Sequence, residues 1–245
     1  MSVSSRFFKG TSTGESMTAP GLSRAFASLP TAWRSRMARW SATNEAALIE
    51  RVYSCSGELP IAPMDPFRAL RMMSPEQAKV VVFGQDPYPT VGQADGLAFS
   101  AERSTRPSLR RIFDVLEADR PGWRRPVSGR LDEWARQGAL LLNPVLTVEV
   151  GRKESHMDVG WQALTSEIVH ILCERPDPPV FLLWGSKAQR FFEYACPPGC
   201  SPRVLTARHP SNDYARSFMV EGSHFAATAG LVDWWSIGTT EISMA

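Results

Sequence analysis

Four short apolar segments, separated by longer amphipathic stretches, constrain the fold of this chain more than any other feature. The segments are KVVVFG (79–84), ALLLN (139–143), VFLLWG (180–185) and RVLTA (203–207). Each is too short for a helix and apolar at successive positions, as in a strand covered on both faces. Helical spacing between them predicts helices over 107–119, 131–138, 159–174 and 186–195. The alternation predicts an α/β fold with a central four-stranded, mainly parallel sheet and helices on both faces.

The remainder of the chain fits one domain preceded by a tail. Residues 1–22 are rich in Ser, Thr and Gly and lack an apolar period, so we expect a flexible tail there. No repeat or linker divides residues 23–245, which we expect to form a single domain. Further helices are predicted over 44–55, over 66–73 with Asp65 as the cap, and near 223–235.

Composition excludes several classes of protein. The chain has 245 residues, of which 43% are hydrophobic and 21% charged, so it can build a core and is not disordered by composition. Its net charge of +2 does not by itself indicate a nucleic-acid binder. No apolar run approaches the roughly 18 to 20 residues that span a bilayer, and the N-terminus lacks the apolar core of a secretory signal. We therefore expect a cytoplasmic protein with reduced thiols that does not enter membranes.

The cysteines offer a possible metal site. Cys196 and Cys200 lie in the segment CPPGC, and Cys55 and Cys173 would complete a set of four. These ligands would come from scattered places without a C-x-x-C pair, which argues against a metal or an iron–sulfur cluster. The sequence therefore predicts neither a metal nor a cofactor.

Polar residues follow each predicted strand. In open parallel sheets the ligand crevice lies beyond the carboxyl ends of the strands. Those ends are followed by residues 84–88, 143–144, 185–186 and 208–211. A carboxylate, an amide, an imidazole and hydroxyls are thereby expected at one rim, which is the set that a chemical site requires. Taken alone, Asp86 also fits a turn or a helix cap, and His209 also fits a packed or capping histidine.

Six segments, in this order and spacing, resemble the family 1-like uracil-DNA glycosylases. They are GQDPYP (84–89), GLAFS (96–100), LLLNPVLTV (140–148), SHMDVGW (155–161), FLLWGSKAQ (181–189) and HPS (209–211). The resemblance covers roughly residues 79 to 230. It implies that 23–245 is the catalytic domain of a monofunctional base-excision-repair glycosylase. Such an enzyme flips uracil out of single- or double-stranded DNA and hydrolyses its N-glycosidic bond, leaving an abasic site.

The resemblance assigns two catalytic residues. Cleavage of the bond leaves an oxocarbenium-like sugar and a uracil anion, and the site must stabilise both charges. Asp86 matches the family carboxylate that faces the sugar cation and helps to position the attacking water. His209 matches the imidazole that donates a hydrogen bond to uracil O2, a role for which a neutral ring suffices.

Four further residues match the uracil-binding positions of the family. Asn143 matches the amide that reads N3–H and O4 and so separates uracil from cytosine. Phe99 matches the ring that stacks on the base, and Tyr88 matches the wall residue that sterically excludes the methyl group of thymine. Gln85 is expected to contribute through its position and backbone at the pocket floor. Without the surrounding pattern, core packing or a turn would account equally for Phe99, Asn143 and Tyr88.

The resemblance also implies loops that grip the DNA backbone. Short Ser/Pro loops pinch the backbone on both sides of the target, because small hydroxyls and free amides at helix starts suit phosphate oxygens. The matching residues are Pro107, Ser108, Gly185, Ser186, Pro210 and Ser211. Arg106, Arg110 and Arg208 are candidates for additional charge. His156, His170 and His224 are expected to be structural.

Two positions depart from the family pattern. Pro89 stands where members usually have a histidine that helps to hold the catalytic water; since Asp86 can still orient water alone, we expect activity to survive at a lower rate. After HPS, members have a leucine that wedges into the duplex, and Asp213 takes that position without a gap. Tyr214 by stacking, or Arg216 by hydrogen bonding, is a candidate replacement. The change predicts a preference for single-stranded uracil and argues against inhibition by the phage protein that captures the leucine.

The sequence leaves three alternative functions open. A uracil-DNA binding module with weak or no cleavage would explain the two departures. A glycosylase with broader specificity for deaminated bases is opposed only by Tyr88 and Asn143. An unrelated α/β hydrolase is disfavoured because no G-x-S-x-G turn is present. In each case we expect a monomer.

Overall fold

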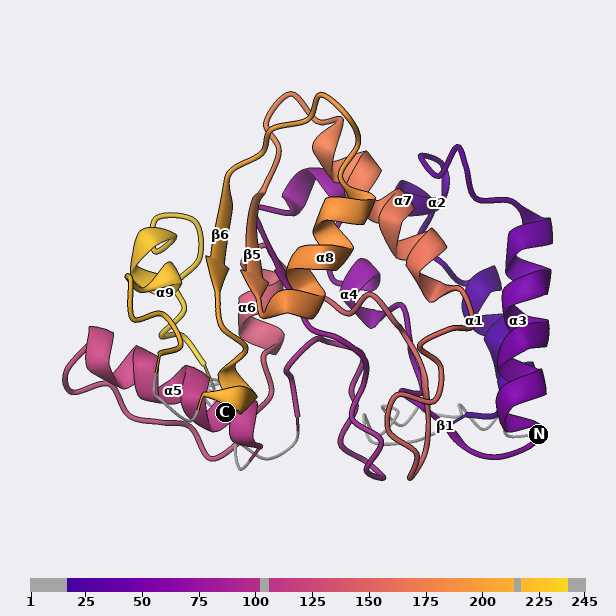
Figure 1. The fold of residues 1–245 in the computed structure, drawn as a ribbon, viewed down its shortest axis with the longest axis horizontal. Coiled ribbons are helices and arrows are strands. Elements are labelled where there is room, and N and C mark those ends of the chain that lie inside the picture. The colour runs from indigo at the N-terminus through magenta and orange to yellow at the C-terminus, as the bar shows by residue number, and fades with distance from the viewer. Residues whose placement is uncertain (1–16, 102–105, 214–216, 238–245) are drawn as a thin grey trace, which may run out of the picture.

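The computed structural model describes residues 17–101, 106–213 and 217–237. At its centre is a parallel sheet with the strand order β3-β2-β5-β6 (Figure 1). The strands are β2 (Val80–Phe83), β3 (Ala139–Leu142), β5 (Val180–Trp184) and β6 (Val204–Ala207). Val80 pairs with Ala139 on one side and with Val180 on the other, so the strand ends are level. The predicted four-stranded parallel sheet is confirmed.

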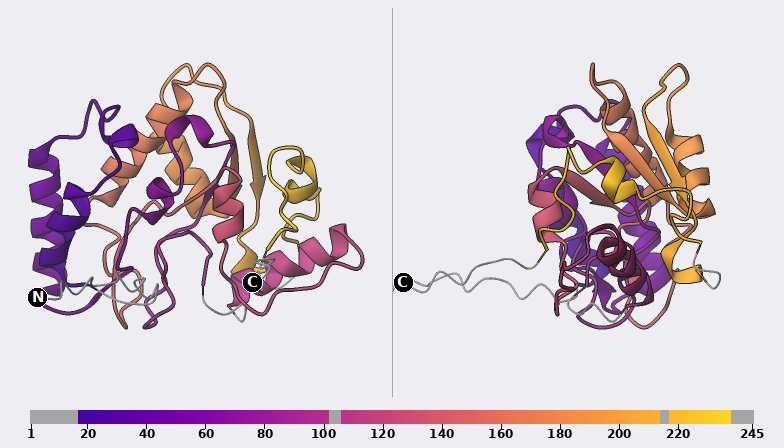
Figure 2. Two further views of the ribbon diagram at one scale, coloured as in Figure 1. Left: turned by 180° about the vertical axis from the view of Figure 1, so that it is seen from behind. Right: turned by 90° about the vertical axis from the view of Figure 1, so that its left-hand side faces the viewer.

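Helices cover both faces of this sheet, with α8 on one face and α6 on the other (Figure 2). The α-helices are α1 (Leu22–Ala27), α2 (Thr31–Arg34), α3 (Ala42–Ser56), α4 (Arg68–Arg71), α5 (Pro107–Asp119), α6 (Asp132–Arg136), α7 (Trp161–Cys173), α8 (Ser186–Ala195) and α9 (His224–Ala227). Three short 3-10 turns are Ala19–Gly21, Pro75–Gln77 and Pro210–Asn212. In the described part of the chain, none of the helices has the length and apolar character that crossing a membrane requires.

The strands differ in burial according to the elements that pack against them. Every residue of β2, β3 and β5 is buried, as the continuous apolar runs predict. β6 is an edge strand and is only half-buried, with Thr206 exposed. The expectation that this strand is covered on both faces is therefore corrected. β3 is also an edge strand, but α4 and α6 pack against it, whereas among the described elements only β5 makes extensive contact with β6.

Residues 17–22, which the sequence places in the tail, belong instead to the folded part. Met17 exchanges two backbone hydrogen bonds with Ile61, of 2.9 and 2.6 Å. Ala19 and Leu22 are fully buried. A few apolar residues among serines and threonines give no detectable period, so only their tertiary contacts reveal the role of this segment.

Two predicted helices are shorter than expected. The helix expected over 66–73 is α4 alone, and the Asp65 carboxylate holds the Phe67 N–H (3.1 Å) and the Arg71 guanidinium. Of the helix expected near 223–235, only α9 forms. The chain beyond α9 turns because Trp134 Nε1 donates to the Trp234 carbonyl (2.8 Å), which holds this segment against α6. A small antiparallel pair, β1 (Ile61–Ala62) with β4 (Val148–Glu149), was not predicted.

Candidate active site

A cavity of about 450 Å³ lies at the carboxyl ends of the central strands. All six residues predicted to act on uracil line it, namely Gln85, Asp86, Tyr88, Phe99, Asn143 and His209. Asp86 follows β2, Asn143 follows β3 and His209 follows β6 by two residues. Since the strands are parallel and in register, their ends meet at one rim, which brings residues from distant parts of the chain together.

Asp86 is half-buried in this cavity. Its Oδ2 accepts a hydrogen bond of 3.2 Å from the Glu154 backbone N–H. Burial raises the pKa of the Asp86 carboxyl to about 6, although the Glu154 N–H and the ammonium groups of Lys153 and Lys187 act to lower it. The group is therefore mostly ionised at neutral pH and is a stronger proton acceptor than an exposed aspartate.

His209 is neutral and presents one N–H. The Ser211 backbone N–H donates to its Nδ1 (3.2 Å), and the Ser211 hydroxyl lies 2.7 Å from the same atom. Because a backbone amide can only donate, this network assigns Nδ1 as the acceptor and places the ring proton on Nε2. Burial lowers the pKa of His209, and the charges of Lys187 and Lys153 lower it further. The ring therefore has one N–H, on Nε2, for an acceptor in the cavity.

Two glycines allow the polar groups to approach so closely. A Cβ added to Gly84 would meet Asn143 Oδ1 at 2.1 Å, so any side chain there would displace the amide. Gly185 has a φ of +98°, and a Cβ there would lie 2.8 Å from His209 Cβ. Asn143 is 8% exposed at the cavity wall, where an amide supplies both a donor and an acceptor.

Phe99 has an unfavourable backbone conformation that places its ring beside His209. Its φ of +64° is in the left-handed region, which costs a non-glycine residue roughly 1–2 kcal/mol. The ring is 8% exposed, and its centroid lies 5.9 Å from that of His209 and 5.3 Å from that of Trp184. The surrounding segment must therefore hold this residue in place.

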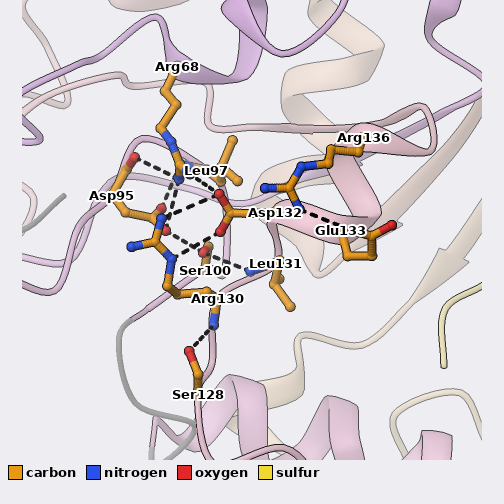
Figure 3. A network of polar contacts seen from close by, with 10 residues as sticks. All are labelled: Arg68, Asp95, Leu97, Ser100, Ser128, Arg130, Leu131, Asp132, Glu133 and Arg136. Atoms are coloured by element: carbon orange, nitrogen blue, oxygen red, sulfur yellow. Dashed lines mark hydrogen bonds and ion pairs between the residues drawn. The ribbon is translucent and has the colours of Figure 1, made fainter. Parts of the chain in front are cut away.

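A buried network around Asp95 holds the segment that carries Phe99 (Figure 3). Asp95 accepts hydrogen bonds from the Leu97 N–H (3.1 Å) and the Ser100 hydroxyl (2.6 Å). The Arg68 guanidinium lies 3.1 Å from Asp95 Oδ2, and the Leu131 N–H donates to the Ser100 hydroxyl (3.1 Å). Sequence reasoning did not single out Asp95, although it lies directly before the GLAFS segment.

Glu154 is a second residue that sequence reasoning missed. Besides its backbone contact to Asp86, its Oε1 accepts from Gln85 Nε2 (2.8 Å) and from Lys187 Nζ (3.1 Å). These two hydrogen bonds lower the pKa of Glu154 to about 2, so it stays ionised. Glu154 thereby joins the loop after β2 to the start of α8. The sequence feature that could have identified Glu154 was its position directly before the SHMDVGW segment.

Tyr88 forms part of the cavity wall. The Arg106 guanidinium lies 5.1 Å from the centre of its ring, in cation–π contact, and its hydroxyl lies 3.4 Å from the Phe99 carbonyl. Burial raises the pKa of the Tyr88 phenol above its ordinary value, so the group stays neutral. The contact gives Arg106 a role in fixing the wall.

The predicted DNA-contacting loops border the cavity. Pro107, Ser108 and Ser211 line it, whereas Gly185 and Ser186 line a wider, open depression of about 980 Å³ beside β6. The two hollows share His209. Pro107 and Ser186 each begin a helix, and Pro210 begins a 3-10 turn. Tyr214 and Arg216 lie outside the described residues.

The other three histidines do not line the cavity. His156 is fully buried, with its ring nitrogens 2.8 Å from the hydroxyls of Ser56 and Thr147. His224 Nδ1 lies 3.1 Å from Trp184 Nε1. His170, which the sequence predicts to be structural, is only half-buried and contacts Arg39.

Comparison with known protein families gives one clear match. A family model for the uracil DNA glycosylase superfamily matches residues 71–227. A uracil-DNA glycosylase of Idiomarina loihiensis is 41% identical over 185 residues, which cover 74% of this chain and 85% of the relative. One from Salmonella agona is 43% identical over 67% of this chain and 72% of the relative. One from Bordetella parapertussis is 41% identical over 78% of this chain and 76% of the relative.

Solved structures have a similar fold. The mimivirus uracil-DNA glycosylase superposes with a TM-score of 0.63 at 23% identity, covering 80% of this chain and 70% of that chain. The UNG from Nitratifractor salsuginis has a TM-score of 0.56 at 17% identity, covering 87% of this chain and 98% of that chain. At these identities the likeness concerns the fold.

Proposed function

This chain belongs to the uracil DNA glycosylase superfamily, and on that premise we propose that it extrudes uracil from DNA and hydrolyses its N-glycosidic bond in base-excision repair. The observation that carries the proposal is the shared cavity of about 450 Å³ with Asp86 and His209 in its wall. Asn143 and Phe99 line the same cavity and supply an amide and a ring for the base. The products are an abasic site and free uracil.

The charges of the two catalytic residues suit the two fragments of the reaction. A water oxygen bonds to C1′ of the deoxyribose as the C1′–N1 bond breaks, and the electron pair leaves with uracil N1. The ionised Asp86 stabilises the sugar cation and accepts the proton of the attacking water, for which its raised pKa of about 6 is well placed. The Nε2–H of neutral His209 donates to uracil O2, where negative charge gathers.

Recognition of the base rests on the cavity wall. Asn143 supplies an acceptor for N3–H and a donor for O4, a pattern that cytosine does not match. Tyr88 narrows the cavity on the side where thymine carries a methyl group, and the Phe99 ring stacks on the flipped base. Gln85 is held away from this role, because its side-chain amide donates to Glu154 (2.8 Å).

The substrate approaches along the rim. Ser108, Ser186 and Ser211, with the proline or glycine before each, contact phosphates on both sides of the extruded nucleotide. This assignment is supported by the position of all three serines around the two hollows that meet at His209.

We further propose that the protein acts as a monomer in the cytoplasm. We also propose that it escapes the protein UGI, with which a mimivirus variant was solved in complex, because Asp213 replaces the wedge leucine.

An oligonucleotide with one uracil tests the proposed reaction. Labelled DNA is incubated with the protein and treated with alkali, which breaks the strand at abasic sites. Asp86→Asn should abolish strand breakage, since it removes the negative charge beneath the sugar. His209→Ala should reduce the rate by about 10²- to 10³-fold, the usual cost of one donor to a developing oxyanion.

Matched variants outside the cavity serve as controls. His170→Ala and Asp177→Asn change the same residue types at a half-buried and an exposed position, and both should retain the wild-type rate. Tight binding of uracil-containing DNA without abasic sites would overturn the proposal in favour of a binding module. Oligonucleotides with hypoxanthine or thymine, assayed in parallel, measure how many bases the cavity accepts.

A further inference from the structure

Three of the four cysteines lie together, away from the cavity. The Sγ atoms of Cys173, Cys196 and Cys200 are within 4.8 Å of one another. Cys173 ends α7, Cys196 directly follows α8, and Cys200 comes four residues later in the CPPGC segment. Cys173 is buried and the other two are half-buried, so the group has one side that solvent reaches.

The parallel topology explains why these residues meet. α8 follows β5 and returns antiparallel to the strands, so its C-terminal end lies at the amino ends of the strands. In Figure 1 the arrow of β6 points to the lower edge of the molecule, whereas α7 and α8 run together toward the upper edge. The three thiols therefore lie at the end of the sheet opposite the catalytic rim.

We propose that Cys173, Cys196 and Cys200 form a binding site for Zn²⁺, with water as the fourth ligand. In a tetrahedral site with Zn–S bonds of about 2.3 Å, the sulfur atoms are roughly 3.8 Å apart. Sulfur atoms already within 4.8 Å reach that spacing through small side-chain rotations. Each thiol loses its proton on binding, so three protons pass to solvent for each ion bound.

The grouping of three thiols favours a shared ion over a single disulfide. The Cys200 thiol points at the Cys173 carbonyl (3.4 Å), and the Cys196 thiol lies 3.9 Å from the Cys200 carbonyl. A disulfide would use two of the three sulfurs and leave the third without a partner, whereas a thiophilic cation uses all three. Within the described residues no other His, Cys, Asp or Glu joins this group, which leaves the solvent-facing position to water.

Such an ion would hold a specific part of the fold. It would join the C-terminal end of α7 to the connection between α8 and β6. β6 is the edge strand that leads to His209, and within the described residues β5 is its one neighbour in the sheet. The ion would therefore stabilise this edge without touching the substrate, and the inference does not depend on the proposed reaction.

Metal content of the full-length protein tests the site. The protein is reduced, incubated with Zn²⁺ and desalted, and bound zinc is counted by mass spectrometry. We expect about one ion per chain and a higher melting temperature than after removal by a chelator. Co²⁺ in place of Zn²⁺ should give a thiolate-to-metal charge-transfer band. Cys173→Ser and Cys200→Ser should lose both signals, whereas Cys55→Ser, at an exposed position, should keep them.

Either of two results would overturn the inference. One is that the reduced wild-type protein takes up no zinc, and the other is that Cys200→Ser binds as much zinc as the wild type. A disulfide found by mass spectrometry, with no zinc uptake after reduction, would show a redox pair in place of a metal site. Circular dichroism confirms that each variant is folded, and Cys200→Ser decides the matter if the variant at buried Cys173 does not fold.

Discussion

The Asp213 carboxylate is turned into the protein, where its Oδ2 accepts a 2.5 Å hydrogen bond from Arg111 Nε. Its side chain is 2% exposed, and Oδ1 accepts from the backbone N–H groups of Ser217 (2.5 Å) and Phe218 (2.9 Å). Burial alone would raise the pKa of Asp213, but Arg111 and these two N–H groups outweigh it and lower the pKa. Asp213, which the resemblance aligns with the wedge leucine of the family, is therefore an anchor for the loop.

Removing the anchor should destabilise the protein. Asp213→Ala leaves two N–H groups and the Arg111 guanidinium without this partner, and we expect the free energy of unfolding to fall by about 2–4 kcal/mol. Urea denaturation followed by circular dichroism measures the change, with exposed Asp177→Ala as the control. Introducing Arg111→Ala in both backgrounds should give a coupling energy above about 1 kcal/mol. A loss below about 0.5 kcal/mol for Asp213→Ala would contradict the anchoring role.

The inward position of Asp213 bears on strand preference. Because the Asp213 side chain is turned inward, it does not fill the space that a flipped base leaves, and we expect extrusion from a duplex to cost the full unstacking energy of a few kcal/mol. We expect the protein to cleave uracil faster in a single strand than in a matched duplex, as compared by kcat/KM on the same sequence. Tyr214→Ala and Arg216→Ala test the two alternative wedges, which should matter in the duplex alone. Equal rates on both substrates would count against this expectation.

The pKa of Asp86 predicts the acid limb of the pH–rate profile. Because the reaction needs the ionised carboxylate, kcat/KM should reach its plateau about one pH unit above 6, be halved near pH 6 and fall about tenfold per pH unit below it. Burial and the nearby lysines lower the pKa of His209, which shifts the titration of the ring away from neutral pH. Single-turnover cleavage between pH 4.5 and 8 measures the profile. A midpoint near the ordinary aspartate value would show that Asp86 is not desolvated in the free enzyme.

The same desolvation predicts a gain in stability when the charge is removed. A carboxyl whose folded pKa is raised from 3.8 to about 6 binds its proton more tightly when folded, so its ionised form destabilises the protein at neutral pH. Asp86→Asn keeps an oxygen for the Glu154 N–H and should raise the free energy of unfolding by about 1–2 kcal/mol, after allowance for partial exposure.

The gain should shrink as pH falls through 6, where the wild-type carboxyl becomes protonated, and vanish below 3.8. Thermal denaturation at pH 5 and pH 8 checks this sign. An Asp86→Asn protein less stable than wild type at pH 8 would mean that the carboxylate is better solvated than the structure indicates.

Gly84→Ala tests the close approach of the strand end to Asn143. The added Cβ would lie 2.1 Å from Asn143 Oδ1, so the amide must move out of its place in the cavity wall. We expect kcat/KM for uracil to fall by about 10²-fold, since small displacements in an active site cost this much. Gly230→Ala is the matched control, because a Cβ there meets nothing within 4 Å. An unchanged rate for Gly84→Ala would show that Asn143 does not read the base.

The sequence by itself determined the sheet and the location of the site. The apolar runs are local patterns, and once they form parallel strands in register their carboxyl ends must meet, which places Asp86, Asn143 and His209 at one rim. Short motifs such as GQDPYP and HPS then indicated which chemistry to expect there. None of these inferences required knowledge of contacts between distant side chains.

Only the tertiary structure decided which way the side chains point and which distant residues meet. Asp213 turns inward because Arg111 and the Ser217 and Phe218 N–H groups outcompete water for its carboxylate. Glu154 reaches Gln85 and Lys187, a pairing that its position directly before SHMDVGW does not reveal. Likewise, the thiols of α7 and the CPPGC turn meet because two helices return along the same face. Such pairings depend on the packing of whole elements, and local periodicity carries no information about them.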